Sequence, residues 1–223
     1  MKINLREVVI AILIFVVVFA VVQISIGSYQ VEMSSMYPTF YGGGVSPSGE
    51  RLAKDCVMVD KLTYRFRGPH RGEVVIIWPT VKEATNPYIK RVIGLPGETV
   101  NIEDGQVYIK KKGSDEFLKL REDLPGVTET PKCRNDGTWS VPKGKYFVLG
   151  DNRDDSSDSS AWPDPFVPRK SFIGKTWLRY WPLSRFGLTP HYSYKLESPT
   201  VSTSTTSITL PAIDLANLSV STT

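Results

Sequence analysis

The sequence predicts a mainly β protein that an N-terminal transmembrane helix attaches to a membrane. One long apolar run lies near the start, and after it come short β-branched and aromatic runs separated by Gly, Pro, Asn and Asp. Hydrophobic residues make up 41% and charged residues 22% of the 223 residues, which is ordinary for a globular protein. This composition excludes a disordered chain and a multi-span transporter.

The apolar run predicts a single membrane span. Residues 8–22 are apolar without interruption, and the 19 residues of 8–26 would extend about 28 Å as a helix. This length is close to the roughly 30 Å hydrocarbon core of a bilayer. Small residues at Ser25 and Gly27 leave a second reading open, a cleavable secretory leader.

The charges before the apolar run predict the orientation of the chain. Lys2 and Arg6 precede it, so the positive-inside rule gives a cytoplasmic segment over 1–7 and an anchor over 8–28. The following β-rich domain, over 29–190, is then expected on the extracytoplasmic side of the cell membrane.

The region after the anchor contains recognisable strands, an insertion and a tail. Buried strands are expected over residues 56–59, 74–78, 146–149 and 172–180, and a hairpin with a Gly-containing turn over 99–109. Residues 103–143 are more polar and are expected to form a smaller inserted β subdomain. A Ser/Thr-rich, disordered tail is expected over 191–223.

Charge and cysteine content limit the possible partners. The net charge is only +4 and is spread along the chain, so no nucleic-acid partner is expected. Cys56 and Cys133 lie far apart, which excludes a disulfide-rich scaffold and gives no zinc-binding spacing. A single disulfide and two free thiols both remain open, and no metal or cofactor is expected.

Polar residues that could carry chemistry gather in three segments. They are residues 33–39, shortly after the apolar run; 88–97, where two cations lie among apolar residues; and 150–160, directly after a predicted strand. Lys90 and Arg91, as neighbours in a strand, point to opposite faces. One of these cations can therefore be buried while the other is paired.

A serine in this chain needs a base other than histidine. His70 lies in a predicted turn and His191 lies next to the tail, so neither is well placed. A lysine base must be neutral, yet at an ordinary pKa near 10.4 only about one lysine in 2,500 is uncharged at pH 7. Burial of Lys90 among apolar residues would have to lower its pKa by roughly 2 to 3 units.

The three segments, in this order after an anchor, resemble the type I signal peptidases, membrane-bound serine proteases that remove leader peptides from exported proteins. The resemblance covers residues 8–188. It rests on Ser35-Met36-Tyr37-Pro38-Thr39, on Tyr88-Ile89-Lys90-Arg91 with Gly94-Leu95-Pro96-Gly97, and on Gly150-Asp151-Asn152-Arg153 with Ser156 and Asp158-Ser159. It implies preprotein substrates and a lipid bilayer as partners.

The resemblance also implies a role for individual residues. Ser35 is the implied nucleophile and Lys90 the implied base, with Ser156 orienting the lysine amine. The other implied roles are an Asp151–Arg91 pair, a supporting position for Asp158, an oxyanion donor in the Ser35 backbone or at Ser34, and pocket walls at Val31, Met36 and Ile89.

Four positions depart from the family pattern. Met33 and Ser34 replace small residues before the nucleophile, Pro87 replaces an acidic residue, and Ser160 stands where the family usually has arginine after Asp-Ser. Two other functions remain open. One is an anchored extracytoplasmic binding or adhesion module without catalysis, and the other is a different Ser–Lys maturation peptidase on the same fold.

Overall fold

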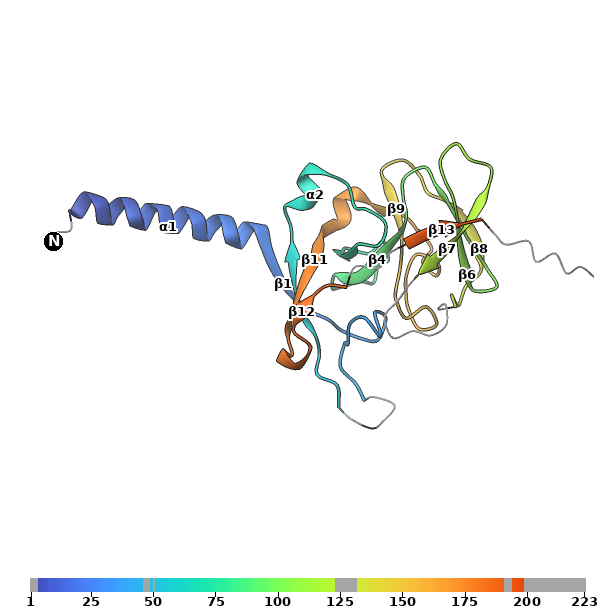
Figure 1. Ribbon diagram of the computed structural model, residues 1–223, viewed down its shortest axis with the longest axis horizontal. Coiled ribbons are helices and arrows are strands. Elements are labelled where there is room, and N and C mark those ends of the chain that lie inside the picture. Colours follow the sequence, from blue (N-terminus) through green and yellow to red (C-terminus); the bar gives the residue numbers. More distant parts are fainter. Residues whose placement is uncertain (1–3, 46–48, 50, 123–131, 191–193, 199–223) are drawn as a thin grey trace, which may run out of the picture.

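One long helix projects from a β-rich body (Figure 1). The computed structural model describes residues 4–45, 49, 51–122, 132–190 and 194–198. The helix, α1 (Leu5–Ser25), is long and apolar enough to cross a membrane, and none of its side chains is buried against the body. The fold is therefore mainly β behind an N-terminal apolar helix, as the sequence predicts.

The boundary of the apolar helix differs from the expected anchor over 8–28. The helix begins at Leu5 and ends at Ser25, and residues 26–28 already belong to strand β1 (Ile26–Gln30). Polar Ser28 and Gln30 on the exposed side of β1 explain the change, because they suit a strand with one solvated face. Lys2, used above for the orientation, lies outside the described residues.

The larger sheet carries the segments singled out in the sequence. Among the described residues its hydrogen-bonded order is β1, β2 (Cys56–Asp60), β11 (Phe172–Trp181), β3 (Val74–Ile77), β4 (Tyr88–Gly94), β9 (Lys145–Leu149) and β10 (Val167–Pro168), with β12 (Gly187–Leu188) beside β11. The neighbouring strands pair antiparallel. Strand β3 is buried on both faces, and β4 and β9 nearly so, which explains their continuous apolar sequences.

The smaller sheet includes strands from outside the expected insertion over 103–143. Its order is β13 (Tyr194–Glu197), β7 (Phe117–Glu122), β6 (Gln106–Lys110), β5 (Thr99–Glu103) and β8 (Gly137–Ser140). The expected tail from residue 191 is therefore wrong at β13. Tyr194 and Leu196 pack on the core while Lys195 and Glu197 are exposed, an alternation typical of an edge strand. Residues 123–131 and 199–223 lie outside the described residues.

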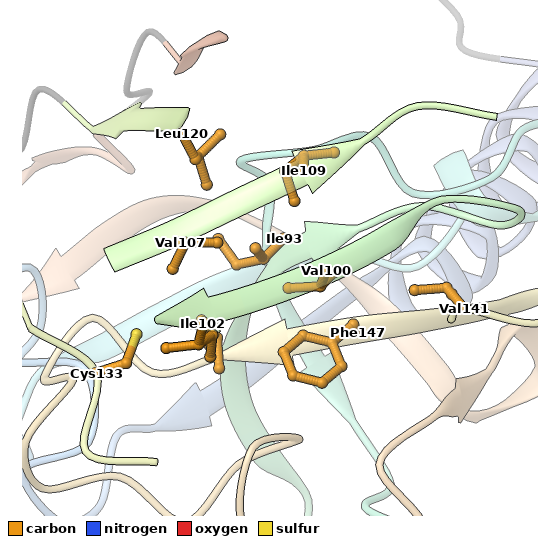
Figure 2. Packing of buried hydrophobic residues seen from close by; sticks show 10 residues of the cluster. Ile93, Val100, Ile102, Val107, Ile109, Leu120, Cys133, Val141 and Phe147 are labelled. Atoms are coloured by element: carbon orange, nitrogen blue, oxygen red, sulfur yellow. The ribbon is translucent and has the colours of Figure 1, made fainter. Parts of the chain in front are cut away.

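The two sheets share one hydrophobic core. Figure 2 shows Ile93 of β4 and Phe147 of β9, from the larger sheet, packed with Val100, Ile109 and Leu120 of the smaller sheet. Each of these five side chains is almost wholly inaccessible to solvent. Burial of this kind contributes about 1.5–3 kcal/mol per large side chain, so the smaller sheet is held firmly against β4 and β9.

Candidate active site

The segment with Ser35 is a loop whose two ends are hydrogen-bonded to one buried residue, Asp55. The Val31 amide donates to the Asp55 carbonyl at 2.8 Å, and the Tyr41 amide donates to Asp55 Oδ2 at 2.9 Å. Arg179 and Arg185 pair with the same carboxylate, at 3.4 and 2.7 Å. Asp55 thus joins the two ends of the loop to Arg179 of β11 and to Arg185 of the 3₁₀ turn that follows it, Leu183–Arg185.

The backbone before Ser35 and the backbone after it approach each other closely at Met33 and Gly42. Met33 has a φ of 62°, in the left-handed region, and forms an isolated β-bridge with Gly42. A Cβ at Gly42 would lie 1.8 Å from the Met33 carbonyl oxygen, so only glycine permits the contact. The chain direction immediately before Ser35 is fixed by this crossing.

Lys90 lies in the middle of β4 and is 3% exposed. Strand β4 passes between two apolar clusters, because Ile89 packs in one and Val92 in the other. Burial lowers the pKa of Lys90 from 10.5 to about 8, although the charges of Asp158 and Asp151 act in the opposite direction. A pKa near 8 leaves about a tenth of the lysine neutral at pH 7.

The neighbouring cation, Arg91, holds β4 against the third polar segment. Its Nε donates to Asp151 Oδ1 at 2.7 Å and one terminal nitrogen donates to Oδ2 at 2.5 Å. The other terminal nitrogen donates to the Gly72 carbonyl at 2.8 Å. Both side chains of the pair are inaccessible to solvent. The two-point geometry fixes where residues 150–160 begin relative to Lys90.

The same third segment also holds the serine loop, through residues that the sequence reasoning missed. The Asn152 amide donates to the Ser35 carbonyl at 3.1 Å, and the Asn152 side chain donates to the Ser34 carbonyl at 3.2 Å. Ser34 Oγ donates to Asp155 Oδ2 at 2.7 Å. The many Asn and Asp residues in this segment signalled side-chain hydrogen bonding. They do not indicate which residues of the chain they bond to.

Ser156 and Asp158 have surroundings that differ from the expectation. The expected hydrogen bond from Ser156 to Lys90 is absent among the described contacts, and the buried Ser156 Oγ has no partner. Asp158 instead accepts from the Gly150 amide at 2.9 Å and from the Ser160 amide and hydroxyl at 3.1 and 2.8 Å. Ser160, which stands where arginine is usual, therefore bonds directly to the carboxylate.

Ser35 and Lys90 both line one groove of about 520 Å³. Val31 and Ile89 also line it, as expected, whereas Met36 is fully buried beneath and is absent from the lining. The lining comes mainly from two stretches of the chain, residues 29–33 and 83–90, together with Ser35, Val57, Ile76 and Ser157.

The described residues contain no group of three or more His, Cys, Asp or Glu side chains that could hold a metal ion. No disulfide joins Cys56 and Cys133. A serine and a desolvated lysine on one groove are instead the residue set typical of a serine hydrolase whose base is lysine.

Comparison with known proteins gives the family. The family model for signal peptidase, peptidase S26, matches residues 5–181. The chain is 39% identical over 138 residues to the probable signal peptidase I-2 of Synechocystis sp., covering 60% of this chain and 58% of that relative. It is 33% identical over 196 residues to signal peptidase IB of Staphylococcus aureus strain Mu50, covering 83% and 94%. The chain therefore belongs to the signal peptidase family, peptidase S26, and is a serine endopeptidase by class.

Solved structures match the chain as well. One of them is the crystal structure of a signal peptidase I from Enterococcus faecalis V583, which is 32% identical to this chain. The match covers 49% of this chain and 97% of that one, with a TM-score of 0.38.

Proposed function

We propose that the protein is a membrane-anchored endopeptidase that removes signal peptides from exported preproteins, with Ser35 as nucleophile and Lys90 as base. The observation that carries the proposal is that one groove is lined by both residues while burial lowers the pKa of Lys90 to about 8. A lysine with this pKa is a workable base near neutral pH, whereas an ordinary lysine is not.

The proposed reaction follows from these two groups. Neutral Lys90 accepts the hydroxyl proton of Ser35 as Oγ bonds to the scissile carbonyl carbon, and then gives that proton to the leaving amine. Water then gives a proton to the same amine as its oxygen bonds to the acyl carbon, and the amine returns that proton to Ser35 Oγ as the bond between Oγ and the acyl carbon breaks. Removal of the proton by a positioned base contributes about 10²–10⁴-fold to the rate of such a step.

The backbone N–H of Ser35 is the proposed donor to the oxyanion. Within the described residues it donates no hydrogen bond, so it is available to a substrate carbonyl. The hydroxyl of Ser34 already donates to Asp155, which argues against Ser34 as the second donor. Loss of one such donor typically costs about 10²–10³ in rate.

The groove suits an extended peptide. Its lining includes the end of β1 and the start of β4, and a substrate strand can add to a strand edge through backbone hydrogen bonds. Val31 and Ile89 are apolar walls close to Ser35, so small side chains next to the cleaved bond are the expected specificity.

The proposed anchor brings this groove to the substrate. Ser35 follows the last residue of α1, Ser25, by only ten positions, and β1 begins immediately after α1. With Arg6 and Lys2 on the cytoplasmic side, the β-rich body lies on the extracytoplasmic side, near the surface where the cleavage region of a leader peptide emerges.

The test uses purified full-length protein in detergent or lipid with a secretory precursor. Wild type is expected to release a product whose new N-terminus, read by sequencing, lies after the leader. Ser35→Ala is expected to be inactive and Ser34→Ala to retain most activity. Activity in Ser35→Ala, together with inactivity in Ser34→Ala, would reject the assignment of the nucleophile.

A further inference from the structure

A second pocket, of about 750 Å³, lies at the end of α1 and is separate from the groove that contains Ser35. Four of its lining residues are cations, which come from the end of β2, from α2 (Thr63–Phe66) and from the 3₁₀ turn η1 (Arg169–Ser171). These cations are Lys61, Arg65, Arg169 and Lys170. The remaining lining residues are Ile24, Tyr64, Phe172 and Ile173.

The positive charge of this basic pocket is not compensated by the protein. Within the described residues none of the four cations forms an ion pair, and no carboxylate lines the pocket. The nearby carboxylates have other partners: Asp60 accepts from Thr63, and Glu73 accepts from Arg67 and Tyr64. Four like charges around one hollow repel one another unless an anion enters.

The pocket is joined directly to the membrane helix. The Lys61 amide donates to the carbonyl of Ser25, the last residue of α1, at 2.9 Å, and Ile24 is part of the wall. Figure 1 shows α2 on the side of the body from which α1 projects. Phe66, at the end of α2, is 85% exposed on the same short helix as Arg65.

We propose that this basic pocket binds the phosphate of an anionic phospholipid in the leaflet at the C-terminal end of α1. The proposal rests on the proposed anchoring of the chain by α1. Arginine side chains bind phosphate oxygens at two points and lysines add charge, while Ile24, Phe172 and Ile173 suit the apolar part of a lipid next to its headgroup. Its consequence is a fixed orientation of the β-rich body on the bilayer surface.

The experiment measures lipid binding to the full chain in mild detergent by native mass spectrometry. Phosphatidylglycerol is the anionic probe and phosphatidylcholine the zwitterionic one. The test variant is Arg65→Gln/Lys170→Gln, which removes two exposed charges of the pocket. The matched control is Lys111→Gln/Lys112→Gln, which removes two exposed charges just after β6, on the smaller sheet.

Wild type is expected to prefer phosphatidylglycerol to phosphatidylcholine by at least about tenfold. At about fivefold per cation, the test variant should bind phosphatidylglycerol roughly 25-fold more weakly, and the control variant should be unchanged. Equal weakening in both variants, no change in either, or equal binding of phosphatidylglycerol and phosphatidylcholine by wild type overturns the proposal.

Two further measurements separate this proposal from the proposed function. Extraction of vesicles with carbonate tests the anchor, and release of the full chain would overturn the lipid site with it. Cleavage of a precursor by the same wild-type sample tests the peptidase. Lipid selectivity without cleavage would reject the peptidase and support the pocket, whereas cleavage without lipid selectivity would reject only the pocket.

Discussion

Replacing Lys90 with methionine is expected to stabilise the protein while abolishing cleavage. The side chain is 3% exposed, and burial lowers its pKa from 10.5 to about 8. At 1.36 kcal/mol per pKa unit, the folded state loses about 3 kcal/mol at neutral pH by holding this group. Methionine has a similar length and no charge, so Lys90→Met should recover much of that free energy of unfolding.

The pH dependence of this gain has a definite sign. Because the pKa of Lys90 is lower in the folded state, the unfolded chain binds more protons between about pH 8 and pH 10.5, and wild-type stability rises with pH in that window. The advantage of Lys90→Met should therefore be full below about pH 8 and should shrink as the pH rises to about 10.5.

The assay is urea unfolding of the full chain in mild detergent at several pH values. Lys111→Met, a change at an exposed position after β6, is the matched control and should give no pH-dependent gain. A destabilised Lys90→Met protein, or a gain that does not change with pH, would refute the claim that Lys90 is held as a desolvated amine.

Three other substitutions test the surroundings of the site. Asp151→Asn removes the carboxylate from the buried pair with Arg91 and should lower the free energy of unfolding by about 3–5 kcal/mol, measured with urea; a loss below about 1 kcal/mol would contradict the pairing. Gly42→Ala should slow cleavage by about 100-fold, because its Cβ would displace the loop before Ser35, and unchanged kinetics would show that the crossing is unimportant. Ser156→Ala removes a buried hydroxyl without a partner, so the free energy of unfolding should change by less than about 1 kcal/mol; the orienting role toward Lys90 that the family resemblance implies predicts cleavage about tenfold slower, and a large loss of stability would assign Ser156 a structural role instead.

Much of the fold could be predicted from local sequence. The apolar run predicted α1, and the β-branched runs predicted β2, β3, β9 and β11. Of these strands β3 and β9 are buried on both faces, which requires continuous apolar residues. Strand β13 was not predicted, because its four residues are followed at once by Ser/Thr-rich sequence. Only its pairing with β7 identifies these residues as a strand.

The site was predicted less completely than the fold. Adjacent cations in a strand indicated that one could be buried while the other is paired, and the family resemblance assigned the pair to Arg91 and Asp151. The structure buries both cations. The contacts of Asp55 with Arg179 and Arg185 could not be predicted, because the two arginines lie 124 and 130 positions away in the sequence. The position of the Ser156 hydroxyl depends on the packing of Gly150 and the Ser35 carbonyl, which only the folded chain brings together.

The pH profile of precursor cleavage tests the central claim most directly, because it reports the protonation of the base. For wild type we predict a rate that rises about tenfold per pH unit below about pH 8 and reaches a plateau above it, matching the lowered pKa of Lys90. Lys90→Arg, which keeps the charge but stays protonated, should be inactive throughout. A rate that is constant from about pH 6 to about pH 9, or cleavage by Lys90→Arg, would contradict the account.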